Sequence, residues 1–237
     1  MTMKNKDSDE KVVCVPREIM LEAAMIRLRG VHKEIEHGYK VLKKYHKTVT
    51  IFGSARLKPS NQYYKKAEEL GRALSTHGYA IVTGGGGGIM EAANKGASEA
   101  MGNSIGFNIA LPHEQTLNPY TTDSYAFSHF APRKIVMTMF ADAYVYFPGG
   151  FGTLDELTEI LTLIQTGKTA KAPVILVGRE FWDAFEHFEK FDIYERNHLI
   201  NKRDEKLFTI TDDIDEVVKL VLANDTYCDH SAAEVID

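Results

Sequence analysis

The sequence predicts an α/β protein built on a doubly wound parallel sheet with helices on both faces, and two observations carry this prediction. First, short runs rich in β-branched and aromatic residues alternate with segments of helical periodicity from residue 48 to residue 223. Second, these runs are apolar throughout rather than alternately apolar and polar, which is typical of strands that helices bury on both faces. The length of 237 residues suits one such domain with a sizeable core.

The first segment is predicted to be a helical extension. Residues 1–47 divide into a polar, flexible lead over 1–16 and one or two amphipathic helices over 17–45, in which Gly30 and Gly38 are candidate breaks. Apolar residues recur there at helical spacing among charged ones. We therefore expect this helical layer to pack on the core or on another subunit.

The other elements follow in regular alternation. Strands are predicted at 48–52, 79–83, 104–109, 143–147, 173–177 and 207–210, and helices at 62–77, 89–101, 133–141, 153–165, 180–191 and 214–223. No internal repeat or low-complexity linker interrupts them, so residues 48–225 are interpreted as one domain, followed by a tail over 226–237. Residues 111–132 form the longest irregular stretch, and long loops in such folds commonly carry function.

Composition and charge exclude several classes of protein. The chain has 28 Lys and Arg against 33 Asp and Glu, a net charge of −5, which disfavours a nucleic-acid partner although residues 1–47 alone carry a net +4. No run approaches the roughly 18 apolar residues of a membrane span, and the polar start does not resemble a signal peptide. Cys14 and Cys228 fit neither a disulfide framework nor a zinc site. We expect a cytoplasmic protein that needs no membrane and no metal.

Ligand-binding residue types follow three of the predicted strands, and open parallel sheets bind ligands beyond the carboxyl ends of their strands. The first group is Gly53, Ser54 and Arg56, directly after the strand at 48–52. A glycine permits a tight turn, a serine hydroxyl donates a hydrogen bond, and an arginine suits an anion. Gly-Ser turns are common, so this group supports a site only together with the others.

The second group is a run of five glycines, residues 84–88, at the start of a predicted helix. Such a run exposes backbone N–H groups at a helix N-terminus, where the helix dipole favours a phosphate. The alternative is a tight turn without a ligand. A P-loop would need Lys-Ser or Lys-Thr where Ile89-Met90 stands, and a dinucleotide site would need an acidic residue where Asn108 stands. A nucleotide phosphate outside these two classes is the better interpretation.

The third group is the segment PGGFGTLDE over 148–156, again a strand end, a glycine turn and a helix start. Thr153 is predicted to cap the helix, with its hydroxyl and the neighbouring amides available to a phosphate. Asp155 and Glu156 fall in the first turn, where negative charge is favoured with or without a ligand. Upstream, Arg133 and Lys134 are predicted to begin a helix, where positive charge opposes the dipole unless an anion or Glu156 compensates it.

Taken together, PGGFGTLDE, the Arg133-Lys134 pair and the run TGGGGGIMEAA resemble the LOG (LONELY GUY) family of cytokinin riboside 5′-monophosphate phosphoribohydrolases, often labelled lysine decarboxylases. The resemblance covers most of residues 48–225 and implies a Rossmann-like fold that releases a free base and ribose 5-phosphate from a nucleoside 5′-monophosphate. It assigns the family's catalytic Arg and Glu to Arg133 and Glu156. The residues predicted to bind the substrate and its phosphate are Gly53, Ser54, Arg56, Gly85, Gly86, Gly87, Met90, Glu91, Lys134, Gly149, Gly150, Gly152 and Thr153.

Further expectations follow from this resemblance. The N-terminal helices and the segment GFNIALPHEQTLNPY resemble the larger bacterial branch of the family, for which AMP is a reasonable substrate beside a cytokinin nucleotide. No cofactor is expected, and lysine decarboxylation is excluded because no lysine motif for pyridoxal phosphate is recognisable. The resemblance implies a homodimer or a larger homo-oligomer.

The chemistry assigns different roles to the charged residues and leaves a competing class open. Glu156 is the predicted carboxylate that stabilises positive charge on the ribose, orients its hydroxyls or activates water, while Arg133 positions the phosphate or the departing base. Asp155 should point elsewhere, and His113 and His129 add little. The competing class is a nucleotide carrier or sensor that binds without hydrolysis. Trp182 with its neighbouring phenylalanines is expected in the core or at a subunit interface.

Overall fold

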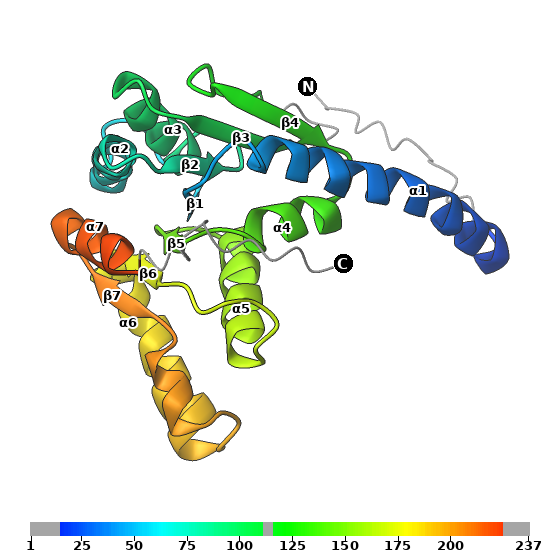
Figure 1. The fold of residues 1–237 in the computed structure, drawn as a ribbon. Helices are drawn as coiled ribbons and strands as arrows, with labels where there is room; N and C mark the ends of the chain where they lie inside the picture. Colours follow the sequence, from blue (N-terminus) through cyan, green and yellow to red (C-terminus); the bar gives the residue numbers. More distant parts are fainter. Residues whose placement is uncertain (1–14, 111–115, 225–237) are drawn as a thin grey trace, which may run out of the picture.

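Seven parallel strands form one sheet in the order β4-β3-β2-β1-β5-β6-β7 (Figure 1). The structure, a computed structural model, describes residues 15–110 and 116–224. The strands are β1 (Thr48–Phe52), β2 (Ala80–Thr83), β3 (Ser104–Ile109), β4 (Asp123–Phe127), β5 (Ala143–Tyr146), β6 (Val174–Val177) and β7 (Thr209–Thr211).

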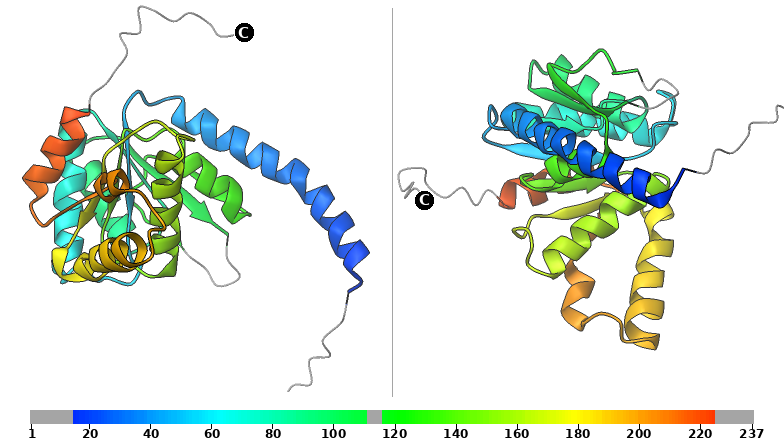
Figure 2. Two further views of the ribbon diagram at one scale, coloured as in Figure 1. Left: turned by 90° about the horizontal axis from the view of Figure 1, so that it is seen from below. Right: turned by 90° about the vertical axis from the view of Figure 1, so that its right-hand side faces the viewer.

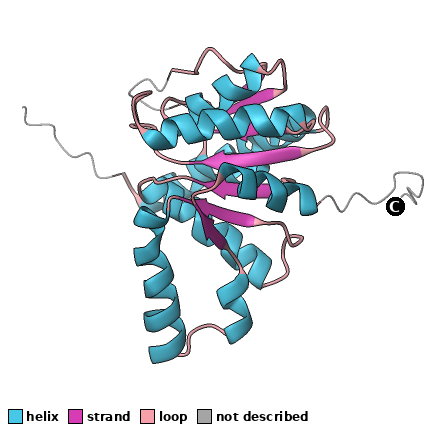
Figure 3. Cartoon of the chain, turned by 90° about the vertical axis from the view of Figure 1, so that its left-hand side faces the viewer, coloured by secondary structure: helices cyan, strands magenta, loops and turns pink. Residues whose placement is uncertain are grey.

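Helices cover both faces of this sheet (Figure 3). They are α1 (Arg17–Leu42), α2 (Gln62–Thr76), α3 (Ile89–Glu99), α4 (Phe130–Thr138), α5 (Phe151–Gln165), α6 (Arg179–His187), the π-helix η1 (Phe188–Arg196), the 3₁₀ helix η2 (Lys202–Lys206) and α7 (Ile214–Ala223). One buried cluster joins the sheet to α2, α3 and α7, and a second joins it to α1, α4, α5 and α6. The Rossmann-like α/β fold predicted from the sequence is confirmed.

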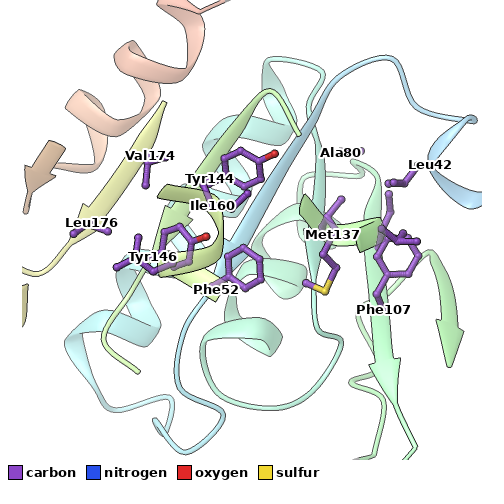
Figure 4. Close-up of a cluster of buried hydrophobic side chains, with 14 of the residues drawn as sticks. Leu42, Phe52, Ala80, Phe107, Met137, Tyr144, Tyr146, Ile160, Val174 and Leu176 are labelled. Atoms are coloured by element: carbon purple, nitrogen blue, oxygen red, sulfur yellow. The ribbon is translucent and has the colours of Figure 1, made fainter. Parts of the chain in front are cut away.

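The apolar runs form strands because both of their faces are buried. Along β5, Ala143 and Val145 pack in the cluster of α2, α3 and α7, whereas Tyr144 and Tyr146 pack in the opposite one. Figure 4 shows these two tyrosines with Phe52 in the second cluster, where the rings of Phe52 and Tyr146 stack at 4.9 Å. Successive side chains of the strand thus pack on opposite faces of the sheet, as the two-residue period of a strand requires.

The order of the strands places a ligand crevice at one point of the sheet. The chain moves from β1 outward to β2, β3 and β4, and then returns to place β5 on the other side of β1. Beyond the carboxyl ends of β1 and β5 the connections therefore diverge in opposite directions, which is where doubly wound folds bind ligands. The first and third residue groups of the sequence analysis both follow these two strands.

The structure corrects several predicted elements. The stretch 111–132 is not irregular throughout, because residues Asp123–Phe127 form the edge strand β4 and α4 begins at Phe130; residues 111–115, with His113, lie outside the described residues. The sequence did not reveal β4 because its first four side chains are alternately half-buried and exposed and only Phe127 is buried, so the strand has no apolar run. The strand predicted at 207–210 is β7, two residues later at its start.

Two helix boundaries also differ from the prediction. α1 is one unbroken helix, and a Cβ on Gly38 would lie 2.6 Å from Val136, so this glycine serves close packing between α1 and α4 rather than a break. α5 begins at Phe151 with Gly150 at its N-cap, so Thr153 is the third helical residue and not the cap. Within residues 15–110 and 116–224, no helix combines the length and the apolar character needed to cross a bilayer.

Candidate active site

A cleft of about 970 Å³ opens at the carboxyl ends of β1 and β5. Most of the residues predicted to form the site line it: Gly53, Ser54, Arg56, Met90, Arg133, Lys134, Gly149, Gly150, Gly152, Thr153 and Glu156. The loops after β1 and β5 and residues of α4 and α5 line it. The structure thus brings the first and third predicted groups together with the Arg-Lys pair.

The backbone of Ser54 ties three strand ends together. Its N–H donates to the carbonyl of Pro148 at 3.0 Å, and its carbonyl accepts from the N–H of Ile89 at the start of α3 at 3.0 Å. The Ser54 hydroxyl accepts from the N–H of Arg56 at 3.1 Å and so shapes the turn after β1. These bonds fix the loops that follow β1, β2 and β5 relative to one another.

The N-terminus of α5 faces the cleft through glycine backbone. No atom lies within 4 Å of the position that a Cβ would take on Gly150 or Gly152, so this surface is open. A Cβ on Gly149 would lie 2.1 Å from the hydroxyl oxygen of Thr153, so Gly149 makes room for that side chain. Free N–H groups and the positive end of the helix dipole at such a surface favour an anion, above all a phosphate.

Arg133 is held in place from several directions although it is 8% exposed. Its Nε donates to the carbonyl of Phe107 in β3 at 2.7 Å, and its Nη1 lies 3.5 Å from Oε1 of Glu156. A Cβ on Gly84 would lie 2.3 Å from its Nη2, so the first glycine of the 84–88 run leaves space for the guanidinium. Burial lowers the pKa of Arg133, and Glu156 acts against that shift.

Glu156 lies one turn into α5, on the side of Gly152 and Thr153. Its side chain is 14% exposed, and burial raises its pKa to about 7, against the opposing effect of the Arg133 guanidinium. A carboxyl group with a pKa near 7 exchanges a proton at neutral pH, as a general acid or base requires. The hydroxyl of Tyr146 donates to the Glu156 carbonyl at 3.1 Å and steadies this turn.

Lys134 and Asp155, the sequence neighbours of the central pair, form an ion pair at the rim of the cleft, which both residues line. Nζ of Lys134 lies 2.8 Å from Oδ2 of Asp155 and 3.2 Å from Oε2 of Glu159. The Asp155 side chain is 62% exposed, compared with 14% for Glu156. The two consecutive carboxylates therefore meet very different surroundings, in the way expected from their positions on a helix.

The middle of the glycine run does not line the cleft. Gly85, Gly86 and Gly87 are not among the lining residues; the carbonyls of Gly85 and Gly86 accept from the backbone and the side chain of Asn118. Glu91 also lies outside the lining and accepts a hydrogen bond from the Tyr64 hydroxyl at 2.8 Å. A substrate-binding role for these four residues stays a prediction.

Several lining residues were missed from the sequence. They are Ala55, Leu57, Asn61, Tyr63, Ile109, Phe130, Pro148, Phe151, Asp155 and Phe181. Phe151 is 92% exposed inside a glycine-rich segment, which is an unusual position for a large apolar side chain and the one signal that could have identified it. Tyr63 and Phe181 lie at the starts of helices, and nothing in the sequence around them distinguishes them from core residues.

Other side chains considered in the sequence analysis lie elsewhere. Trp182 is fully buried in the core, as expected, whereas Phe188 is 52% exposed. His129 contacts the carboxylate of Glu34 at 3.3 Å rather than the cleft. Among the described residues, no three His, Cys, Asp or Glu side chains come together as metal ligands.

Comparison with known proteins identifies the family. The family model described as "Possible lysine decarboxylase" matches residues 90–221, more than half of the chain. The chain belongs to this family, the LOG family. It is 33% identical over 148 residues to a cytokinin riboside 5′-monophosphate phosphoribohydrolase LOG of Oryza sativa subsp. japonica, covering 61% of this chain and 60% of the rice protein.

Two further proteins extend this likeness. A cytokinin riboside 5′-monophosphate phosphoribohydrolase of Rhodococcoides fascians is 30% identical over 142 residues, covering 57% of this chain and 70% of that protein. Among solved structures, the molybdenum cofactor carrier protein of Chlamydomonas reinhardtii superposes with a TM-score of 0.56 at 27% identity, over 75% of this chain and 98% of the carrier. The family's fold thus occurs in proteins named as enzymes and in one named as a carrier.

Proposed function

We propose that this protein hydrolyses the N-glycosidic bond of a nucleoside 5′-monophosphate, AMP or a cytokinin riboside 5′-monophosphate, to a free base and ribose 5-phosphate. The observation that carries the proposal is Glu156: a carboxyl group that is only 14% exposed and has a pKa of about 7, 3.5 Å from a buried guanidinium, in a cleft beside an open helix N-terminus. The names of the family's rice and Rhodococcoides members support it.

In this proposal the phosphate binds the N-terminus of α5. The amides after Gly150 face the cleft without side chains above them, and Arg56 and Lys134 add positive charge at the rim. A phosphate held there places the ribose one helical turn further along α5, next to Glu156. Binding energy from the phosphate then orients the sugar for reaction, which explains why a nucleoside without phosphate should be a poor substrate.

Ionised Glu156 acts on the ribose carbon that loses the base. The bond from this carbon to the base nitrogen breaks with its electron pair going to the base, and positive charge develops on the ribose ring. The carboxylate stabilises that charge and takes a proton from the attacking water, whose oxygen forms the new bond to carbon. The departing base takes up one proton from solvent, so the products are the neutral base and ribose 5-phosphate.

Arg133 contributes charge rather than protons. A guanidinium remains protonated near neutral pH, so it cannot serve as an ordinary acid. It is fixed by the Phe107 carbonyl and faces Glu156, which suits it to position the phosphate or the departing base. Aromatic lining residues such as Tyr63 and Phe130 offer surfaces on which a base can stack.

The test is incubation with AMP, with isopentenyladenosine monophosphate and with adenosine, followed by chromatography of the free base. We expect base from one or both monophosphates and far less from adenosine, and release by Glu156→Gln that is at least about a hundredfold slower. Asp155→Asn is the matched control, because it removes the neighbouring carboxylate, which is 62% exposed and pairs with Lys134 rather than with the buried Arg133. Equal release by the wild type and by Glu156→Gln would refute the mechanism.

The second candidate is a nucleotide carrier without hydrolytic activity. It is favoured by the likeness to the Chlamydomonas carrier protein, which covers nearly all of that chain. Tight binding of AMP in calorimetry without release of base over hours would favour the carrier. We place the protein in the cytoplasm and propose that it forms a homodimer or a larger homo-oligomer, as its resemblance to the family implies.

A further inference from the structure

The N-terminal half of α1 extends past the body of the protein. Figure 2 shows that the first turns of this helix project beyond the other helices and strands. The buried residues of α1 are Glu34, Gly38, Val41 and Leu42, all in its second half, which packs against α4 and β4. Residues 17–29 lie almost entirely exposed.

This free half is apolar. Its exposed side chains include Ile19, Met20, Leu21, Met25, Ile26 and Leu28, which are between 53% and 74% exposed. A helix with so much apolar surface is normally covered in the working protein, because contiguous apolar patches of this kind mark interaction sites. The question is therefore what covers it.

The spacing of one apolar stripe indicates a helical partner. Leu21, Ala24, Leu28, Val31, Ile35, Gly38 and Leu42 follow one another at intervals of three and four residues along α1. This is the spacing of a helix-to-helix seam. The last three residues pack on the body, where Gly38 contacts Val136 of α4. Leu21, Ala24 and Leu28 continue the same seam beyond the body of the protein, where a second helix would cover them.

The chain itself presents a matching helix surface. On α4 and at its C-cap, Ala131, Ile135 and Met139 lie at intervals of four residues and are all exposed, and Phe140 beside them is 61% exposed. Own α1 covers the other side of α4. A second copy of the chain would therefore bring an uncovered apolar helix of suitable length to the free half of α1.

Charge supports the same partner. Among the ion pairs of the described residues, Asp155 and Glu159 of α5 share Lys134 of α4, which leaves one negative charge in excess beside α4. The free half of α1 carries Arg17, Arg27 and Arg29 against Glu18 and Glu22, a net charge of +1. A membrane surface fits less well, because helices that lie on membranes have a strongly basic polar face, whereas the charges here are of mixed sign.

We propose that the free half of α1, residues 17–31, packs on the exposed stripe of α4 in a second copy of this chain. Two copies related by a twofold axis cover each other's stripes reciprocally, because each provides one α1 and one α4. The helical extension then clamps the partner subunit. The proposal does not depend on the reaction that the cleft performs.

The test is a cross-link between two differently tagged, co-expressed copies in a Cys14→Ser, Cys228→Ser background. One copy carries Leu28→Cys and the other Ile135→Cys, and a short bismaleimide is added to the purified full-length protein. We expect a product that contains both tags. The matched control replaces Leu28→Cys with Lys33→Cys, on the opposite side of α1 from the seam, and should give none.

A second variant separates this contact from any other interface. Leu28→Glu should lower the mass measured by light scattering, while circular dichroism and the melting temperature of the body stay unchanged. The proposal is overturned if the two-tag product does not exceed the control, if only Leu28→Cys pairs with Leu28→Cys, or if Leu28→Glu leaves the mass unchanged. Loss of binding to anionic liposomes in Leu28→Glu without a change of mass would identify a membrane instead.

Discussion

Two glycine-rich junctions, residues 84–88 between β2 and α3 and residues 148–153 between β5 and α5, look alike in the sequence but differ in the structure. A Cβ on Gly84 would lie 2.3 Å from Arg133, and a Cβ on Gly88 would lie 2.2 Å from the carbonyl oxygen of Ser54. At the second junction, a Cβ on Gly149 would lie 2.1 Å from the Thr153 hydroxyl oxygen, but Gly150 and Gly152 have nothing within 4 Å of that position. The first junction uses glycine for close packing, and the second also uses Gly150 and Gly152 to keep a surface open.

This difference explains how the two junctions share one site. The 84–88 run lets the loop after β2 approach the loop after β1 and leaves room for the Arg133 guanidinium. The 148–153 segment offers bare amides to the cleft and places Glu156 one turn behind them. A glycine run at a helix N-terminus therefore indicates that something approaches the backbone closely there. The structure shows whether that is an open ligand surface or another segment of the protein.

The largest expected effect concerns the carboxylate behind the open junction. Glu156→Gln should lower kcat by about 10²–10⁴-fold, the range typical of a lost general base or acid. Asp155→Asn, one residue earlier and 62% exposed, should keep activity within a few-fold. Base release measured at substrate saturation makes the comparison. An equal loss in both variants would mean that helix charge, and not the position of Glu156, matters.

Replacing a glycine by alanine should change the stability of the fold in opposite directions at the two junctions. Gly88 has φ +64°, so Gly88→Ala combines a strained backbone with overlap on Ser54 and should destabilise the fold by about 3 kcal/mol or more. Gly152→Ala lies inside α5 with free space around it and should stabilise the fold by about 0.5–1 kcal/mol. Its methyl group would narrow the cleft and raise KM.

Urea unfolding of both variants, together with their KM values, tests this pair. The contrast fails if Gly152→Ala loses as much stability as Gly88→Ala. It also fails if Gly88→Ala folds normally and loses only substrate affinity, because that result would make the 84–88 run a ligand loop like its counterpart.

The pKa of Glu156 gives a prediction for stability and one for activity. Its pKa rises from the ordinary 4.5 to about 7 on folding, so the native state binds this proton more tightly than the unfolded state does. The stability that the proton contributes is fully present below pH 4.5 and is lost as the pH rises through 7, which lowers the free energy of unfolding by up to about 3 kcal/mol. Glu156→Gln should lack this decline, and wild-type kcat/KM should rise with pH through about 7.

Unfolding free energies of the wild type and Glu156→Gln between pH 5 and 8 provide the measurement. Parallel curves would mean that Glu156 titrates in the same range in both states. The activity profile is independent of that result, since an acid limb near pH 4.5 alone would show an ordinary carboxyl group in the cleft.

Much of the fold and part of the site could be predicted from the sequence, for identifiable reasons. Continuous apolar runs revealed the buried strands, whereas β4 stayed hidden because an edge strand with exposed side chains has no such run. The pairing of Arg133 with Glu156 followed from family resemblance and a strand-end rule. The crowding around Gly84 and the lining role of Phe130 depend on contacts between distant segments, which composition and spacing do not contain.

The smallest expected effect lies at a third helix start, that of α4, which has no glycine run. Here the carboxylate of Glu34 in α1 accepts from the N–H groups of Ser128 and His129, at 3.0 and 3.3 Å. Burial raises the pKa of Glu34, but hydrogen bonds from Ser128 and from the His129 side chain outweigh it and lower the pKa overall. Glu34→Gln keeps the shape but loses the charge and should cost about 1 kcal/mol of stability. Since α4 carries Arg133, kcat should fall several-fold, while a packing contact that does not depend on charge, such as that of Gly38 with Val136, is preserved.

The control is Glu36→Gln. Among the contacts described, the Glu36 carboxylate binds only the exposed Lys40, so this variant should change neither stability nor kcat. If both variants behave alike, α1 supports the site through packing alone, and α4 differs from the two glycine junctions in needing no anion at its start.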